Sequence, residues 1–230
     1  MNIIEHLESH HGKSKAKYIK NIIYGGIDGI ITTFSIIAAC FGANLGLKYI
    51  IAMGLANLMA DGFSMGFGDY ISSLFESNYI LSEKIKEELE FEQNNEFEVN
   101  EMVELYKNEG LEHDDSQQIV TILVSKVKYK PFFIKSMVSM ELNLEIPEDN
   151  YKSIIKKEAL YTFFSFIIFG FVPLALYIVC HWINYSKYNT IFIIDCFITL
   201  LTISGLGYYQ AVLTKQSKLM GCLILTVNGF

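Results

Sequence analysis

Residues 48–92 read KYIIAMGLANLMADGFSMGFGDYISSLFESNYILSEKIKEELEFE and determine the architecture of the chain. The first part of this stretch, up to about residue 75, is apolar and exceeds the ~20 residues that a helix needs to cross a bilayer. Its second part, from about residue 77, is amphipathic and rich in glutamate. The stretch therefore predicts a membrane helix that runs on into a charged helix outside the bilayer.

Three further segments are long and apolar enough to span a membrane: residues 21–42, 159–180 and 190–212. After Lys218 the chain reads LMGCLILTVNGF, which is apolar but too short to cross. This segment is either the start of a fifth helix whose remainder is missing from this chain or an interfacial tail. The sequence predicts an all-α membrane protein of about five transmembrane helices, the fifth incomplete here, and not a soluble enzyme.

Charge divides the chain into four parts. Residues 76–158 hold 19 of the 25 acidic residues but only 10 of the 18 lysines. We expect an N-terminal arm (1–20), two spans (21–75), an acidic helical metal-binding domain (76–157) and a final membrane part (158–230). Within the acidic domain, the patterns predict helices over about 77–92, 98–108 and 116–140, with a stop at Gly110 and a kink at Pro131.

Lysine placement orients the spans. Lysines precede the first span, fill the acidic domain and follow the fourth span, whereas the two other loops hold only Lys48 and Lys187. We therefore expect the N-terminus and the acidic domain to face the cytoplasm. The first twenty residues are polar, so no secretory signal peptide is predicted. All basic residues are lysine, which argues against nucleic-acid recognition through bidentate arginine.

Polar residues inside the spans are candidate functional residues. Asp28 lies in the middle of the first span, where a carboxylate costs several kcal/mol, and no span contains a lysine that could pair with it. In the second span, polar or thioether side chains recur every four residues and form a stripe about 18 Å long. The stripe consists of Asn57, Asp61, Met65 and Asp69. A thioether beside carboxylates favours a transition metal over Ca²⁺ or Mg²⁺.

Two other features have a structural and a functional interpretation. Gly25 with Gly29, and Gly62 with Gly66, have the spacing that lets helices approach closely, within one chain or between two copies. Asp195 in the fourth span is either a proton relay or a polar residue that contacts Thr199 of its own helix, and we favour the contact.

Glutamates of the acidic domain occur in two pairs with i, i+3 spacing. Glu87 and Glu90 share one helix face, and so do Glu98 and Glu101. A hairpin at residues 93–95 could bring the pairs together around one cation. The competing interpretation is a solvated acidic helix with interspersed lysines, and the spacing alone does not decide between the two.

The motifs YGGIDGIITTFSIIAA (24–39) and ANLMADGFSMGFGDYIS (56–72), with the glutamate-rich insert, resemble the vacuolar iron transporter family, which includes the yeast calcium-complementing transporters. The resemblance covers about residues 21–212. It implies a five-helix homodimer that moves Fe²⁺, and often Mn²⁺ or other divalent ions, from the cytosol into a vacuole in exchange for protons. It also implies that Asp28 and Met65 are pathway ligands at the dimer interface.

The resemblance also implies roles for individual residues of the acidic domain. The two glutamate pairs match the family's metal-binding ExxE pairs, and a methionine and a glutamate of the last insert helix fall on Met137 and Glu141. The chain departs from the family pattern in three places: Val138 replaces a second methionine, Asn95 replaces a proline, and the fifth helix is incomplete.

Alternatives remain at this stage. Carboxylate and thioether ligands admit Fe²⁺, Mn²⁺, Co²⁺, Ni²⁺ and Zn²⁺, and the membrane is that of a vacuole or of the endoplasmic reticulum. A different class would be a membrane-anchored carboxylate protein that oxidises iron. That chemistry needs two ExxH pairs, and the chain offers only Glu8 with His11. A third class would be a metal-sensing scaffold that the spans merely anchor.

Overall fold

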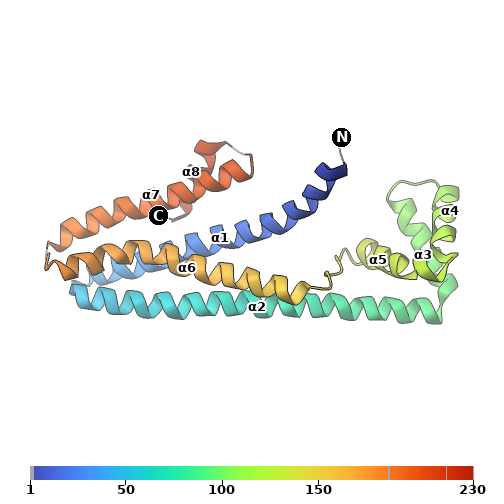
Figure 1. Ribbon diagram of the computed structural model, residues 1–230, viewed down its shortest axis with the longest axis horizontal. Helices are drawn as coiled ribbons and strands as arrows, with labels where there is room; N and C mark the ends of the chain where they lie inside the picture. Colours follow the sequence, from blue (N-terminus) through green and yellow to red (C-terminus); the bar gives the residue numbers. More distant parts are fainter. Residues whose placement is uncertain (1–2, 186, 216, 230) are drawn as a thin grey trace. The chain divides into compact units, whose positions relative to one another are not determined.

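The computed structural model describes residues 3–185, 187–215 and 217–229, with side chains described between Tyr18 and Val227. These residues form helices and no strand (Figure 1). The helices are α1 (Ile3–Gly42), α2 (Leu47–Gln93), α3 (Asn95–Asn108), α4 (His113–Val124), the 3₁₀ turn η1 (Val127–Tyr129), α5 (Lys130–Glu141), α6 (Tyr151–Trp182), α7 (Tyr188–Leu213) and α8 (Lys218–Gly229). The all-α prediction is confirmed.

Within the described residues, four helices are long and apolar enough to cross a membrane: Tyr18–Gly42 within α1, and α2, α6 and α7. These four candidate spans coincide with the four segments that the sequence predicted to be long and apolar enough. Helix α2 has 47 residues and is therefore about 70 Å long, more than twice the ~30 Å thickness of a bilayer core. Only its apolar part is needed to span the membrane, and the glutamate-rich remainder continues without a break to Gln93, as the sequence predicted.

The chain divides into two compact units. The first unit comprises Met1–Ile71 and Ile155–Phe230, and the second unit comprises Ser72–Ile154. The first unit contains the apolar parts of all four spans.

Helices α1, α2, α6 and α7 of the first unit pack around buried aliphatic side chains. One core cluster joins all four helices through Ile37, Ile50, Tyr177 and Ile191, and another joins Ile30 to Ile203. Glycines allow the closest approaches. A Cβ on Gly25 would lie 2.7 Å from the Thr162 carbonyl oxygen, and Gly29 touches the Phe166 backbone.

Gly62 and Gly66 of α2 also pack against α6, where a Cβ on either would lie 2.8 Å from a side-chain carbon of Ile167 or Phe163. The spacing predicted from the sequence therefore serves contacts within one chain.

Helix α8 lies along α7. A Cβ on Gly207 would lie 2.6 Å from the Gly221 carbonyl oxygen, and the hydroxyls of Ser204 and Thr226 are 3.0 Å apart. Because residues later in α8 contact residues earlier in α7, the two helices run antiparallel. The apolar segment after Lys218 is thus helical and packs against the last of the four spans.

The second unit has its own core of Met102, Val103, Val120, Phe133, Ile134, Met137 and Val138. Helix α3 ends near Gly110, whose φ of 101° favours glycine, as predicted. The prediction of one kinked helix over 116–140 is wrong. Helix α4 ends at Val124, Lys126 is extended, and α5 begins with Pro131 in its first turn. Proline lacks an N–H and clashes with the carbonyl four residues earlier, so it suits a helix start better than a helix interior.

Candidate metal pathway and acidic cluster

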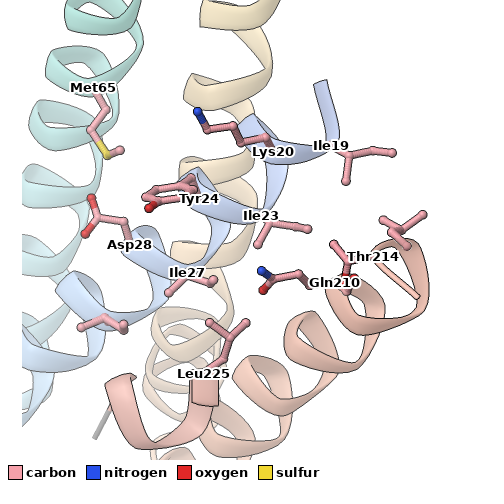
Figure 2. Close-up of a pocket in the computed structure, with 12 residues that line it drawn as sticks. Ile19, Lys20, Ile23, Tyr24, Ile27, Asp28, Met65, Gln210, Thr214 and Leu225 are labelled. Carbon is pink, nitrogen blue, oxygen red and sulfur yellow. Dashed lines mark hydrogen bonds between the residues drawn. The ribbon is translucent and has the colours of Figure 1, made fainter. Parts of the chain in front are cut away.

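A cavity of about 950 Å³ opens in the first unit between α1, α2, α7 and α8. Figure 2 shows Asp28 of α1 and Met65 of α2 pointing toward one another at its edge, with Tyr24 beside Asp28. The lining residues are Ile19, Lys20, Ile23, Tyr24, Ile27, Asp28, Ile31, Met65, Gln210, Leu213, Thr214 and Leu225. Two residues predicted from separate spans therefore share one cavity.

Asp28 and Met65 are both half-buried, and so is Asp61. Asp61 is close enough to Asp28 for the two carboxylates to interact electrostatically. Two carboxylates in a partly desolvated environment repel each other unless a proton or a cation binds to them. A carboxylate facing a thioether, with a second carboxylate nearby, is a donor set that fits a borderline transition metal.

The hydroxyls near Asp28 are directed to the backbone. Thr32 donates to the carbonyl of Asp28 at 2.7 Å, and Ser35 donates to the carbonyl of Ile31 at 2.7 Å. Thr32 and Ser35 share a helix face with Asp28, but their hydroxyl protons already form hydrogen bonds to backbone carbonyls. The polar side of the cavity comes instead from Lys20, Gln210 and Thr214.

Sequence reasoning missed Gln210 and Thr214. The signal was a polar pair with i, i+4 spacing at the end of the fourth span, and Thr214 donates to the Gln210 carbonyl at 3.0 Å. Nothing in one sequence indicates that this helix end lines the same cavity as Asp28. Their contribution to the cavity depends on how α7 packs against α1.

The predicted stripe on α2 is half-buried along its whole length, and buried residues lie on one side of it. Of its four members, only Met65 lines the cavity. Asp69 has a different environment, because Asn21 of α1 and Thr162 of α6 donate hydrogen bonds to its Oδ2 at 3.1 and 2.7 Å. Asp69 thus joins three helices, and Asn57 is not among the residues that line the cavity. Their assignment to a transport path remains a prediction.

Two of the predicted glutamate ligands in the second unit are buried. Glu87 and Glu98 are each 5% exposed, and Oε2 of Glu87 has no hydrogen-bond partner. Burial, followed by the charges of Glu141, Glu90, Glu98 and Glu101, raises the pKa of Glu87 to about 7. The carboxylates of α2, α3 and α5 therefore form one electrostatically coupled group, which we call the acidic cluster: Glu87, Glu90, Glu98, Glu101 and Glu141.

The same causes act on other members of the acidic cluster. Burial, followed by the charges of Glu101, Glu90 and Glu141, raises the pKa of Glu98. Partial desolvation, followed by the charges of Glu101 and Glu90, raises the pKa of Glu141. Each shift favours binding of a positive charge, either a proton or a metal ion.

Lysines in the described part of the chain pair with other glutamates. The ion pairs are Lys84 with Glu88 (3.2 Å), Lys86 with Glu83 (2.5 Å), Lys107 with Glu104 (2.7 Å) and Lys130 with Glu92 (2.6 Å). No ion pair found among the described side chains includes a member of the acidic cluster. The interpretation as a solvated helix with interspersed lysines therefore fits the outer face of these helices but not Glu87 and Glu98.

As the described side chains stand, no three acidic, histidine or cysteine groups converge tightly enough to hold a metal ion. Met137 is fully buried in the core of the second unit. Ligation by Met137 or by the whole acidic cluster therefore remains a prediction that requires side chains to rotate. The Glu8 and His11 side chains of the alternative ExxH pair lie outside the described residues.

Asp195 of α7 does not make the expected contact with Thr199. Asp195 is fully buried, and neither of its carboxylate oxygens nor the Thr199 hydroxyl has a hydrogen-bond partner. The preferred interpretation of Asp195 as a residue satisfied by its own helix is therefore wrong. The two side chains follow the helix surface at i, i+4 spacing, but this spacing brings residues near one another without ensuring a bond.

These features define a class: a helical membrane protein with a carboxylate and a thioether in a cavity between its spans, and with a coupled acidic cluster in a second helical unit. The chain belongs to the VIT family, whose family model matches residues 19–230. The membership confirms the resemblance that the two span motifs carry.

Named relatives cover nearly the whole chain. It is 35% identical over 230 residues to a vacuolar iron transporter of Toxoplasma gondii, covering 98% of this chain and 74% of that protein. It is 34% identical over 230 residues to a vacuolar iron transporter of Plasmodium falciparum, covering 99% and 82%. A vacuolar iron transporter 1 of Tulipa gesneriana is 26% identical over 226 residues, covering 98% and 86%.

Proposed function

We propose that this protein is a proton-coupled transporter that moves Fe²⁺ from the cytosol into a vacuole, for iron storage and detoxification. The observation that carries the proposal is the facing pair of Asp28 and Met65 at the edge of the cavity between α1 and α2 (Figure 2). Family membership and relatives named vacuolar iron transporter support iron as the ion and the vacuole as the compartment.

The first step is collection of the ion by the acidic cluster. Glu87 and Glu98 are buried without a lysine partner among the described residues, and burial followed by the neighbouring carboxylates raises the pKa of both carboxyls. A divalent cation relieves the repulsion between these carboxylates. Partly exposed Glu90, Glu101 and Glu141 can then complete the shell by rotation. Capture at this unit raises the local ion concentration and keeps free iron low in the surrounding cytosol.

The second step is passage through the first unit. The ion exchanges part of its water for the Asp28 carboxylate and the Met65 thioether, with the Asp61 charge nearby. This donor set accepts Fe²⁺ and also Mn²⁺, Co²⁺, Ni²⁺ and Zn²⁺, and it disfavours Ca²⁺ and Mg²⁺, which prefer oxygen ligands alone.

The third step is release against protons. Asp28 cannot hold a proton and a metal ion on the same oxygens, so protonation from an acidic lumen expels the cation. The return of Asp28 to its ionised form delivers the proton to the cytosol. One carboxylate thereby links the two flows.

We also propose that two copies form a homodimer with α1 and α2 at the interface and with the N-terminus and second unit in the cytosol. Large apolar side chains on one face of α2 support this, because they are exposed in the single chain: Met53, Met59, Phe63, Phe67 and Ile71. Lipid covers whatever part of this face the partner leaves open.

The deciding experiment is metal uptake into proteoliposomes with an imposed pH gradient, offering Fe²⁺, Mn²⁺ and Zn²⁺ in turn. Wild type is compared with Asp28→Ala and with Asp115→Ala, an exposed acidic residue of α4 that serves as the matched control. Uptake that requires both the gradient and Asp28 supports the proposal. Metal binding without uptake in the wild type rejects it and favours a sensor or an iron-oxidising protein.

A further inference from the structure

A group of buried polar side chains lies in the first unit, apart from the cavity. Asp195, Thr199, Tyr177 and Thr33 are each at most 1% exposed. Both oxygens of Asp195 and the hydroxyl oxygens of the other three lack a hydrogen-bond partner. None of the four lines the cavity that contains Asp28 and Met65. Buried polar atoms without partners are rare in folded proteins because each costs free energy.

The hydroxyls of Thr33 and Thr199 are unusual for these helices. Several neighbouring hydroxyls return to the carbonyl four residues earlier, at 2.7 Å in each case: Thr32, Ser35, Thr202 and Thr226. That bond is open to any serine or threonine in a helix. Thr33 and Thr199 do not make it, so their hydroxyls are free to serve another group.

Packing between α1 and α7 places these side chains at one level. Ile30 shares a core cluster with Ile203, and Ile37 shares one with Ile191, so the two helices run antiparallel. Thr33 lies on the same face as Ile30 and Ile37 and falls between them, opposite the segment that contains Asp195 and Thr199.

Helix α6 brings Tyr177 to the same place. Tyr177 belongs to the core cluster with Ile37 and Ile191, and it interacts electrostatically with Asp195. Three helices therefore contribute buried hydroxyls at the level of the Asp195 carboxyl group.

The surroundings of Asp195 contain titratable groups but no counter-charge. The titratable groups that interact with Asp195 are Tyr177 on α6 and Cys196 on α7, and Cys180 on α6 lies near Tyr177. No ion pair among the described residues involves Asp195. An isolated carboxylate in a membrane interior is far more costly than the neutral acid, whose hydroxyl and carbonyl need only hydrogen-bond partners.

We propose that Asp195, with the hydroxyls of Tyr177, Thr199 and Thr33, forms an intramembrane proton-binding site separate from the metal pathway. The carboxylate takes up one proton to become a neutral acid, and its charge changes by one when the proton leaves. The hydroxyls can donate to the carboxylate or accept from the acid after small rotations, so both states have partners. Because this site is not a metal ligand, it can hold its proton while the cavity holds a cation.

The role of this site in transport rests on the proposed function, but proton binding itself does not. Infrared difference spectroscopy of the full chain in lipid bilayers detects the C=O stretch of a protonated carboxyl during a pH titration. We expect a carboxylic acid band in the wild type that disappears in Asp195→Asn and shifts in Tyr177→Phe. Asp149→Asn, at an exposed position of the second unit, should leave the band unchanged. A spectrum that is identical in wild type and Asp195→Asn overturns the proposal.

Transport measurements give a second readout, which would stay unchanged if Asp195 had only a structural role. In proteoliposomes, Asp195→Asn should lose part of the dependence of the initial Fe²⁺ uptake rate on lumenal pH, whereas loss of folded protein would scale all rates equally. An unchanged pH dependence overturns the coupling role. If the wild type moves no metal at all, the proposed function fails, and the infrared result still decides whether Asp195 binds the proton.

Discussion

The Thr162 hydroxyl of α6 donates a 2.7 Å hydrogen bond to Oδ2 of Asp69 on α2, and Asn21 of α1 donates to the same oxygen. A single carboxylate therefore ties three spans together. This arrangement gives Asp69 a structural role that its place on the polar stripe does not reveal.

We expect Asp69→Ala and Thr162→Ala to be non-additive. Each removes the same bond, and an interhelical hydrogen bond in a membrane contributes about 0.6–1.7 kcal/mol. A double-mutant cycle on unfolding of the full chain in detergent should therefore give a coupling energy in that range. Thr202→Ala is the control, because the Thr202 hydroxyl bonds within its own helix. A coupling energy of zero between Asp69 and Thr162 would contradict this role.

Gly29→Ala should destabilise the first unit. Its Cβ would meet the backbone of Phe166, which cannot move without shifting α6. Gly205 has open space around it, so Gly205→Ala should be neutral or stabilising by up to about 1 kcal/mol through helix propensity. Thermal unfolding of both variants in the same detergent separates the two effects. Equal melting temperatures would show that α1 and α6 do not pack as closely as described.

Met65→Leu tests the thioether as a ligand. Leucine keeps the size and apolar character but removes the sulfur, so we expect Fe²⁺ uptake to fall several-fold relative to Mn²⁺, which relies less on soft ligands. Met220→Leu is the matched control, because Met220 is exposed on α8 and does not line the cavity. The measurement is competitive uptake of the two ions into proteoliposomes. The same Fe²⁺ to Mn²⁺ ratio in Met65→Leu and wild type would remove Met65 from the pathway.

The sequence predicted the features that hydrophobic periodicity and hydropathy determine. The four spans, the continuous helix through residues 48–92 and the stop at Gly110 follow from local rules about apolar length and glycine. The half-buried stripe on α2 likewise follows from its four-residue spacing. Each of these properties belongs to one helix, so one sequence is sufficient to predict it.

The features that the sequence did not predict depend on which residues pack together in the tertiary fold. Asp69 and Asp195 both lie within long apolar helices, yet one receives two hydrogen bonds and the other has none. Gln210 became a cavity residue only through the packing of α7 against α1. The separation of α4 from α5 follows from placing Val120 and Phe133 in one core, which a single continuous helix would not allow. Residue spacing indicates which helix face a side chain occupies, but only the tertiary fold determines which groups that face contacts.

Metal binding by the acidic cluster should weaken as the pH falls through about 7. Glu87 ionises with a pKa raised to about 7, and only its carboxylate form can ligate a metal. Between pH 8 and pH 6, competition from this one proton should lower the apparent affinity by about tenfold. Isothermal titration of the full chain in lipid nanodiscs with Mn²⁺, which resists oxidation better than Fe²⁺, measures the change.

Two variants decide whether Glu87 causes this dependence. Glu87→Gln should bind more weakly at pH 8 and show a much flatter pH profile, whereas Glu104→Gln, which removes an exposed glutamate paired with Lys107, should retain the wild-type profile.

The raised pKa of Glu87 also affects the stability of the fold. A carboxyl whose folded pKa is raised stabilises the fold below its unfolded pKa of about 4.5, and that stabilisation is lost as the pH rises through about 7. The metal-free wild type should therefore lose stability in the second unit between pH 5 and pH 8 and regain it when Mn²⁺ is added, whereas Glu87→Gln should lose less stability over this range.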